Sequence, residues 1–135
     1  MTSERISISS GGPWEAGVGY SRAVRVGRHV HVSGSTAMTA SGLVGAGDPY
    51  AQAMQTLQTI ERALIQAGAR LTDVVRTRVY LVRVADWPEV ARAHAEVFAT
   101  IRPASTLLVV AALIDPSLLV EIEAEAIIAD ANTNT

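Results

Sequence analysis

The sequence predicts a single α+β domain over residues 1–135, in which two helices pack on one face of a mostly antiparallel sheet. Segments with strand and helix periodicity follow one another in the order strands, helix, strand, helix and two strands. The segment TLLVVAALI, residues 106–114, is apolar without alternation, so both faces of that strand require burial. Because two helices cover only one face of a sheet, we expect another subunit to cover the other.

The N-terminal part is expected to form strands. RISIS, residues 5–9, alternates apolar and polar residues until a Gly-Gly-Pro sequence interrupts the pattern, which indicates an edge strand. AVRVGRHVHVSG, residues 23–34, contains two alternating runs on either side of a Gly-Arg pair, which is typical of a hairpin. Residues 36–47 are small and rich in glycine, and we expect a surface loop there.

The first helix is predicted to begin at Asp48-Pro49 and to end at Gly68, because an N-cap acid precedes a proline that fits the first helical position. Its apolar stripe consists of Tyr50, Met54, Leu57, Ile60 and Leu64. The second helix is predicted to begin with a capping box between Asp86 and Glu89 and to end before Arg102-Pro103. Its inner stripe consists of Val90, Val97, Phe98 and Ile101.

Three further strands complete the predicted sheet. VVRTRVYLV, residues 74–82, is rich in β-branched and aromatic residues. Two strands close the domain, at residues 105–113 and 118–129. The last residues, DANTNT, are expected to form a frayed tail at 130–135.

Composition excludes several classes of function. The sequence contains no cysteine, which removes disulfides, thiolate catalysis and cysteine-ligated metal sites. A net charge of −2 with scattered arginines gives no basic surface for a nucleic acid, so we expect no nucleic-acid partner. The polar N-terminus lacks the apolar core of a signal peptide, and the longest apolar run is too short to span a bilayer. We therefore expect a cytosolic protein with no membrane contact.

Residues 120–126, VEIEAEA, place three acids in an otherwise apolar stretch. Glu121, Glu123 and Glu125 recur with a period of two, so on a strand all three lie on one face and the apolar residues on the other. A solvated face explains this alternation, as in many half-buried antiparallel strands. Alternatively, one of the three acids faces a pocket and acts as a general base.

Two other groups of residues invite a functional interpretation but fit simpler ones. GLVGAGDPY, residues 42–50, resembles a phosphate-binding loop, but it lacks the third glycine, and Asp48 at the helix start would repel a phosphate. His29 and His31 share one strand face without a third metal ligand at a recognisable spacing, so we predict no metal site and a polar sheet face. A pocket-lining role is the alternative for His31. His94 falls on the apolar stripe of the second helix, where a hydrogen-bonded, partly buried imidazole is expected.

The chain resembles the reactive-intermediate deaminase family, also called the Rid or YjgF type and long labelled L-PSP endoribonuclease. The resemblance covers residues 19–126. It depends on five segments in this order: GYSRAVRVG, the strand ending VSG, AQAMQTLQTIERALIQAGARLTDVVRTRVYL, DWPEVARAHAEVFATIRPA and VEIEAEA. No single segment is specific, but their order and spacing are.

The resemblance implies a chorismate-mutase-like fold assembled as a homotrimer, with a central barrel and small-molecule clefts between the subunits. Archetypal members hydrolyse reactive enamines and imines to a keto acid and ammonia without a cofactor. By position, Tyr20 matches the family's cleft tyrosine, and Ser33 and Gly34 match its Ser-Gly pair. Glu121 matches the glutamate that handles the attacking water, which leaves Glu123 and Glu125 as structural or surface acids.

The cleft residues that this chain changes are as informative as those it retains. Archetypal members read R-P-A-R-S, whereas residues 102–106 read RPAST, so Ser105 stands where the arginine that binds the substrate carboxylate belongs. Ser105, Thr106 and Leu107 are therefore expected to line a more apolar and less anion-selective cleft. Ser35 replaces the usual glutamine. A charge-assisted pair worth roughly 1.5–3 kcal/mol per hydrogen bond would be lost to a 2-imino acid.

These observations leave three hypotheses about the function of this protein. The first is a divergent family enzyme that hydrolyses an imine, an enamine or a related small molecule whose recognition does not depend on a carboxylate. The second is a trimeric binding or chaperone-like protein that retains the cleft without catalysis, which the changes at Ser105 and Leu107 would suit. The third, a ribonuclease, is poorly supported, because the charge is unsuitable and no acid–base pair for phosphodiester cleavage can be named.

Overall fold

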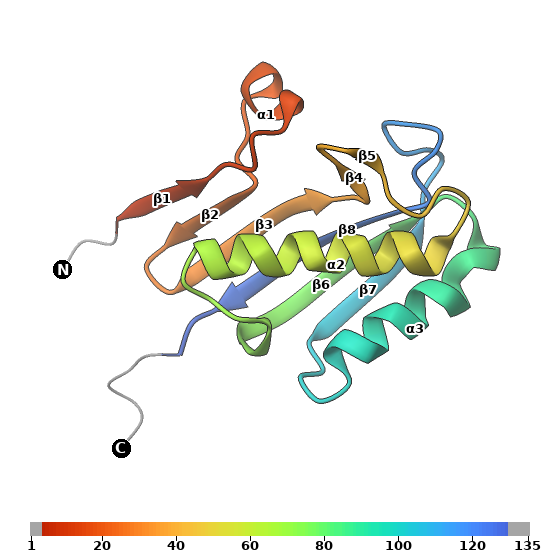
Figure 1. Cartoon of the computed structure of the whole chain (residues 1–135). Helices are drawn as coiled ribbons and strands as arrows, with labels where there is room; N and C mark the ends of the chain where they lie inside the picture. The colour runs from red at the N-terminus through yellow and green to blue at the C-terminus, as the bar shows by residue number, and fades with distance from the viewer. Residues whose placement is uncertain (1–3, 130–135) are drawn as a thin grey trace.

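The computed structural model describes residues 4–129, which form a six-stranded sheet with the strand order β1-β2-β3-β8-β6-β7 (Figure 1). All neighbouring strands are antiparallel except β6 and β7, which are parallel. The strands of this sheet are β1 Arg5–Ile8, β2 Ala23–Val26, β3 His29–Ser35, β6 Val74–Leu81, β7 Ala104–Val109 and β8 Val120–Ile127. The helices are α1 Pro13–Val18, α2 Pro49–Gln66 and α3 Trp87–Phe98, with short 3-10 turns at Leu71–Asp73 and Val84–Asp86.

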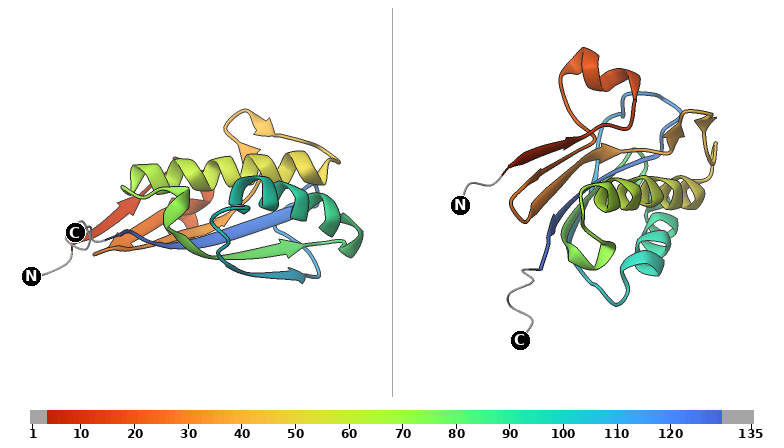
Figure 2. Two further views of the ribbon diagram at one scale, coloured as in Figure 1. Left: turned by 90° about the horizontal axis from the view of Figure 1, so that it is seen from below. Right: turned by 60° about the vertical axis from the view of Figure 1, so that its left-hand side comes forward.

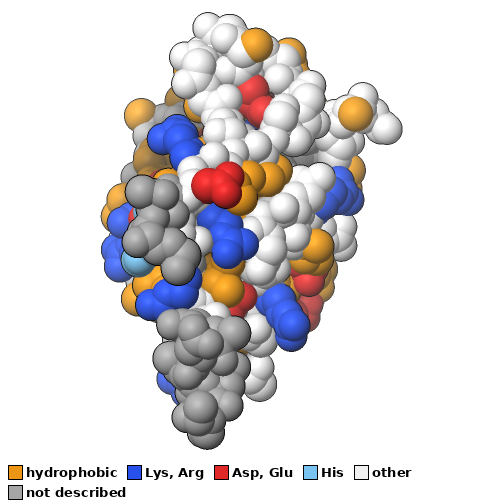
Figure 3. All heavy atoms as spheres, turned by 90° about the vertical axis from the view of Figure 1, so that its left-hand side faces the viewer, with side chains coloured by type: hydrophobic (Ala, Val, Ile, Leu, Met, Phe, Trp, Pro, Cys, Tyr) orange, Lys and Arg blue, Asp and Glu red, His pale blue; other side chains and the backbone are white. Residues whose placement is uncertain are grey.

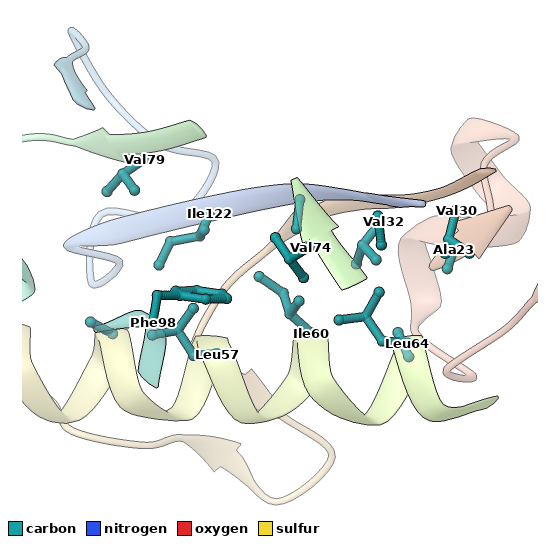
Figure 4. Close-up of a cluster of buried hydrophobic side chains, with 14 of the residues drawn as sticks. Ala23, Val30, Val32, Leu57, Ile60, Leu64, Val74, Val79, Phe98 and Ile122 are labelled. Carbon is teal, nitrogen blue, oxygen red and sulfur yellow. The ribbon is translucent and has the colours of Figure 1, made fainter. Parts of the chain in front are cut away.

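Helices α2 and α3 lie side by side on one face of the sheet, and the other face is uncovered (Figure 2). The core between the layers is formed by the apolar stripe of α2 and the alternate residues of the strands that face it. Figure 4 shows Leu57, Ile60 and Leu64 directed from α2 toward Ile122 and Val74 of the sheet. The α+β class with two helices on one face is confirmed.

The two predicted helix starts have different outcomes. The Asp48 side chain accepts a hydrogen bond from the Ala51 amide at 3.0 Å, so the N-cap of α2 is confirmed. The capping box predicted for α3 is wrong, since Asp86 makes no capping hydrogen bond. Its carboxylate instead accepts two hydrogen bonds from Arg83, each of 3.1 Å. A charged donor three residues earlier in the chain therefore takes the place of the helix amides.

Three segments of the chain differ from the sequence-based prediction. Residues 36–47 are not a plain loop, because they contain a small hairpin of β4 Met38–Thr39 and β5 Gly42–Leu43. Helix α1 was not predicted, and its six residues are too few to show periodicity. Strand β7 ends at Val109 because β6, its partner, ends at Leu81 opposite that residue. The tail predicted at 130–135 lies outside the described residues.

The uncovered face is polar over β6 and β8, where the three acids of β8 lie. Of the exposed apolar residues of β7, only Leu108, which is 51% exposed, lies on this face, because it pairs with Tyr80. Leu107 and Val109 are 39% and 50% exposed but lie on the helix side of the sheet edge. The expectation of an apolar uncovered face is therefore met only locally, at Leu108 and at Val26 of β2. None of the described helices is long and apolar enough to cross a membrane.

Candidate functional site

The three acids of β8 lie on the uncovered face, but their surroundings differ. Glu123 accepts a hydrogen bond from the Tyr80 hydroxyl and lies 3.5 Å from Nη1 of Arg78. Glu125 lies 3.7 Å from the same Arg78 nitrogen and 3.5 Å from Nδ1 of His31. The two acids thus belong to one charged network across β3, β8 and β6, which agrees with their predicted structural role.

Glu121 is the exception in this row. Among residues 4–129 its carboxylate has no hydrogen bond and no ion pair. Burial raises the pKa of the Glu121 carboxyl above its ordinary value; the charge of Arg22 opposes this shift, and that of Glu123 adds to it. An unpaired carboxylate with a raised pKa is a stronger base than an exposed one, and its oxygens are available to a water molecule.

Gly34 provides the close contact that positions Glu121. A Cβ atom at this glycine would lie 2.1 Å from Oε2 of Glu121, which is far inside van der Waals contact. The pairing of β3 with β8 shifts register between Val32 and Ser35, so this segment carries a β-bulge. The bulge places the Gly34 backbone against the Glu121 carboxylate, and only glycine leaves that carboxylate in its present position.

Tyr20 and Ser33 lie beside this pair. Helix α1 ends at Val18 and is capped by Gly19, which has a positive φ of 91°, and Tyr20 follows directly. The Ser33 hydroxyl donates to the carbonyl of Ser21 at 2.6 Å, which ties the end of β3 to the segment before β2. Both side chains line a shallow hollow formed by Arg5, Glu15, Ala16, Gly19, Tyr20, Ser21, Val24 and Ser33.

A second hollow, here called the Glu121 hollow, lies between β8 and the segment that follows β7. Its lining consists of Gly34, Tyr80, Val110, Ala112, Leu113, Glu121 and Glu123. The polar side chains in it offer oxygen acceptors, and none of its lining residues is a cation. The hydrogen bond to Glu123 raises the pKa of Tyr80, so the phenol stays protonated and remains the donor of that bond.

The structure therefore brings Tyr20, Ser33, Gly34 and Glu121 to one end of the sheet, where α1 and the β7–β8 connection also lie (Figures 1 and 2). All four were candidates from the sequence. They come from three separate segments of the chain, and the order β2-β3-β8 makes them neighbours.

The other three candidates lie on β7, which β6 separates from β8. Ser105 accepts a hydrogen bond of 2.8 Å from Thr77 on the helix side of the sheet. Thr106 accepts one of 3.2 Å from Nη2 of Arg76, and Leu107 is partly exposed at the edge. Within one chain these residues do not reach Glu121, and their place in a cleft stays a prediction.

The histidines have structural surroundings. His94 is partly buried, packs on Phe98 at a ring distance of 4.7 Å and shares a 2.8 Å hydrogen bond with Thr77. Burial lowers its pKa, as expected for a neutral imidazole in a core. His29 is exposed, and His31 lies in the network of Glu125. Residues 4–129 contain no group of three His, Cys, Asp or Glu side chains that could hold a metal ion.

Sequence reasoning missed two residues of this region. Tyr80 lies opposite Glu121 in the pairing of β6 with β8, a register that the sequence of either strand does not give. Arg22 lies two residues after Tyr20, and its guanidinium donates to the Gly34 carbonyl at 2.8 Å. The sequence does contain a signal for Arg22, because a cation follows the G-x-Y segment closely. The pairing of β2 with β3, which brings Arg22 to Gly34, is not evident from that signal.

This arrangement defines a class of small α+β domains with an acidic site beside a bulged strand, and comparison with known proteins identifies the family. The model of the family described as Endoribonuclease L-PSP matches residues 13–128. The chain belongs to this family, which includes the Rid and YjgF proteins, so the predicted resemblance is confirmed.

Relatives with known structure or activity cover most of the chain. The crystal structure of Rv2704 from Mycobacterium tuberculosis, a member of the YjgF/YER057c/UK114 family, is 48% identical, with a TM-score of 0.85 over 93% of this chain and 100% of that one. The human 2-iminobutanoate/2-iminopropanoate deaminase is 37% identical over 80% of this chain and 79% of its own length. The 3-aminoacrylate deaminase RutC of Acinetobacter baylyi is 35% identical, over 76% and 82% respectively.

Proposed function

We propose that this protein hydrolyses the C=N bond of a small imine or enamine, with Glu121 activating the attacking water. The observation that carries this proposal is the unpaired, partly buried Glu121 carboxylate against Gly34, at the end of a row whose other acids are paired. The names of the human and Acinetobacter relatives support the reaction class, since both are deaminases.

The chemistry uses one base. Glu121 accepts a proton from water as the water oxygen bonds to the imine carbon, and the nitrogen gains a proton as the π electrons move onto it. The resulting carbinolamine passes its hydroxyl proton through Glu121 to the nitrogen as the C–N bond breaks, which releases ammonia and a carbonyl product. An enamine first gains a proton on carbon and becomes the imine. Val110, Ala112 and Leu113 supply apolar contacts for the substrate body.

The complete cleft is proposed to form in a homotrimer with a central barrel. The exposed apolar residues of edge strand β7 support a contact between copies, and β7 carries the candidates Ser105, Thr106 and Leu107. A neighbouring copy would bring these residues to the Glu121 hollow. Light scattering in dilute solution tests the assembly, and a stable monomer would contradict it. Leu108→Arg, which places a charge among the exposed apolar residues of β7, should weaken the assembly.

Substrate choice is proposed to differ from that of members with an arginine at position 105. Ser105 has no charge, so ordinary 2-imino acids should be slow substrates if their carboxylate depends on this position. Ser105→Arg should then raise kcat/KM tenfold or more, equivalent to about 1.4 kcal/mol. Fast wild-type turnover of carboxylate imines would instead show that another cation binds the anion. Kinetics of both proteins, with the keto acid as readout, distinguish these outcomes.

The principal alternative is a trimeric protein that binds a small ligand without turnover. The absence of a cation among the lining residues of the Glu121 hollow favours this alternative over a deaminase of the archetypal kind. Ribonuclease activity is less well supported. On the face shown in Figure 3, arginine side chains are interspersed with acidic and apolar ones and form no continuous basic track.

The direct test generates imines with an amino-acid oxidase and follows their decay with and without the protein. Wild type should accelerate release of the carbonyl product above the rate in buffer, for at least one imine of a panel with and without a carboxylate. Ligand-dependent stabilisation without acceleration of any imine would favour the binding alternative.

A further inference from the structure

Arg22 is a cation fixed beside Glu121 that neither the family resemblance nor the position of Ser105 points to. Its Nη1 donates to the Gly34 carbonyl and to the Ser35 hydroxyl, both at 2.8 Å. Its Nη2 lies 3.4 Å from the Tyr20 hydroxyl. Arg22 is not itself a lining residue of either hollow, but its guanidinium contacts Gly34, which lines the Glu121 hollow, and Tyr20, which lines the other. It is thus held by the same bulge that contacts Glu121.

The guanidinium retains unused donors. An arginine has five N–H groups, and the two on Nη1 are accounted for by Gly34 and Ser35. The Nε group and one N–H of Nη2 have no acceptor among residues 4–129, and neither nitrogen is a buried unsatisfied atom. The Nε and Nη2 nitrogens share one edge of the planar group, an edge that can receive the two oxygens of a carboxylate in a bidentate pair.

The charge of Arg22 is also uncompensated at short range. No carboxylate in residues 4–129 lies within 4.0 Å of its guanidinium. Glu15 and Glu121 are the acids whose pKa its charge lowers, and Glu15 is already hydrogen-bonded to Ser9 and Ser10. In contrast, Arg78 is engaged by both Glu123 and Glu125 and has no comparable freedom.

We propose that Arg22 binds the anionic group of the substrate through its Nε and Nη2 edge, and so supplies the positive charge that position 105 lacks. This inference rests on the proposed function in placing the anion beside a C=N carbon that faces Glu121. The substrate class is then a small carboxylate whose anion approaches from the Tyr20 side of the site and not from β7. The site would select anionic imines even though Ser105 is neutral.

A purely structural role is the competing explanation, since Arg22 also holds the bulge at 33–35. Arg22→Gln separates the two roles. The glutamine amide retains an NH2 donor for the Gly34 carbonyl, but it has no charge and no second nitrogen for a bidentate contact with a carboxylate. If Arg22 binds the anion, KM for a carboxylate imine should rise tenfold or more while kcat changes less than threefold. The corresponding neutral amide imine should show no change. Arg28→Gln, at the far hairpin turn, is the matched control, because within residues 4–129 the only side-chain hydrogen bond of Arg28 is that to the Ile128 carbonyl, at 3.3 Å.

Binding without turnover gives an independent test. Pyruvate and its neutral amide, pyruvamide, are titrated into wild type, Arg22→Gln and Arg28→Gln, while the Arg22 Nε–H signal is followed by NMR in the wild type. Pyruvate should shift that signal and bind at least tenfold more weakly to Arg22→Gln, and pyruvamide should bind all three proteins equally. Equal pyruvate affinity in wild type and Arg22→Gln would overturn the proposal. An unchanged Arg22 Nε–H signal in the wild type at saturating pyruvate would also overturn the proposal, and this measurement does not depend on whether the variant folds.

The two proposals fail in different ways. If no imine is hydrolysed but pyruvate still binds through Arg22, the proposed anion site is supported and the proposed enzymatic function is contradicted. If imines are hydrolysed and pyruvate affinity does not depend on Arg22, the enzyme is upheld and this inference is lost.

Discussion

The two ends of strand β8 carry the same residue type in different environments. Glu125 and Glu123 lie where β3 and β6 present His31, Arg78 and Tyr80, and each is paired with at least one of these side chains. Glu121 lies where β3 is bulged and presents only the Cα of Gly34, and its carboxylate has no partner in residues 4–129. The comparison teaches that the neighbouring strands, and not the acid itself, decide which carboxylate is paired and which is left without a partner.

The strongest test of this difference between the acids of β8 is to neutralise each acid in turn. Glu121→Gln should reduce imine hydrolysis by about 10²-fold or more, the contribution expected of a general base. Glu123→Gln and Glu125→Gln should change the rate little, because they remove charges outside the reaction. Steady-state kinetics and circular dichroism on the three variants provide the test. Similar losses in all three, or unfolding of Glu121→Gln alone, would make Glu121 a structural acid.

The contact with Gly34 can be broken without touching the acid. In Gly34→Ala the new methyl group would lie 2.1 Å from the present position of Oε2, so the Glu121 carboxylate must move away. We expect roughly a tenfold loss of kcat at nearly unchanged Tm, since a small misplacement of a catalytic group is costly. Gly17→Ala is the matched control, because a Cβ at Gly17 has nothing within 4 Å. Full activity in Gly34→Ala would show that the close approach is unimportant.

Stability should respond to pH at Glu121 in the opposite sense to an ordinary paired carboxylate. Burial raises the folded-state pKa of Glu121, so its contribution to stability is present below its unfolded pKa and is lost as pH rises through the folded value. Glu121→Gln, which resembles the protonated form, should therefore have a higher Tm than wild type at neutral pH. The difference should vanish in acid. Thermal unfolding between pH 4 and 8 measures it, and a variant less stable than wild type at pH 7 would contradict the account.

The smallest effect is expected at the paired end of the row. Tyr80→Phe removes the hydroxyl that donates to Glu123 and leaves the ring in place, and Arg78 continues to neutralise the acid. The free energy of unfolding should fall by about 1 kcal/mol, a typical value for one hydrogen bond. Urea unfolding measures this change. A loss of activity as large as that of Glu121→Gln would instead assign Tyr80 a role in the reaction.

Local chemistry in the sequence was sufficient for most of the fold. The Asp48 cap and the stripe on α2 gave the first helix, and the alternating runs around residues 27–28 gave the β2–β3 hairpin. The capping box at Asp86 failed because Arg83, a stronger donor, engages the same carboxylate. The parallel pairing of β7 with β6 was beyond the sequence pattern, since an apolar run without alternation fits either direction.

For the candidate site, the sequence by itself determined which acids share a face, because side chains alternate along a strand with a period of two. Through resemblance it also predicted Tyr20, Ser33, Gly34 and Glu121 as cleft residues, and the structure places these four near one another. Only the tertiary structure decided that Arg22 and Tyr80 join them, since residues far apart in the chain meet through strand order and register. The raised pKa of Glu121 was likewise decided there, because desolvation depends on which backbone and side chains surround a carboxylate, and a bulge in another strand set that environment.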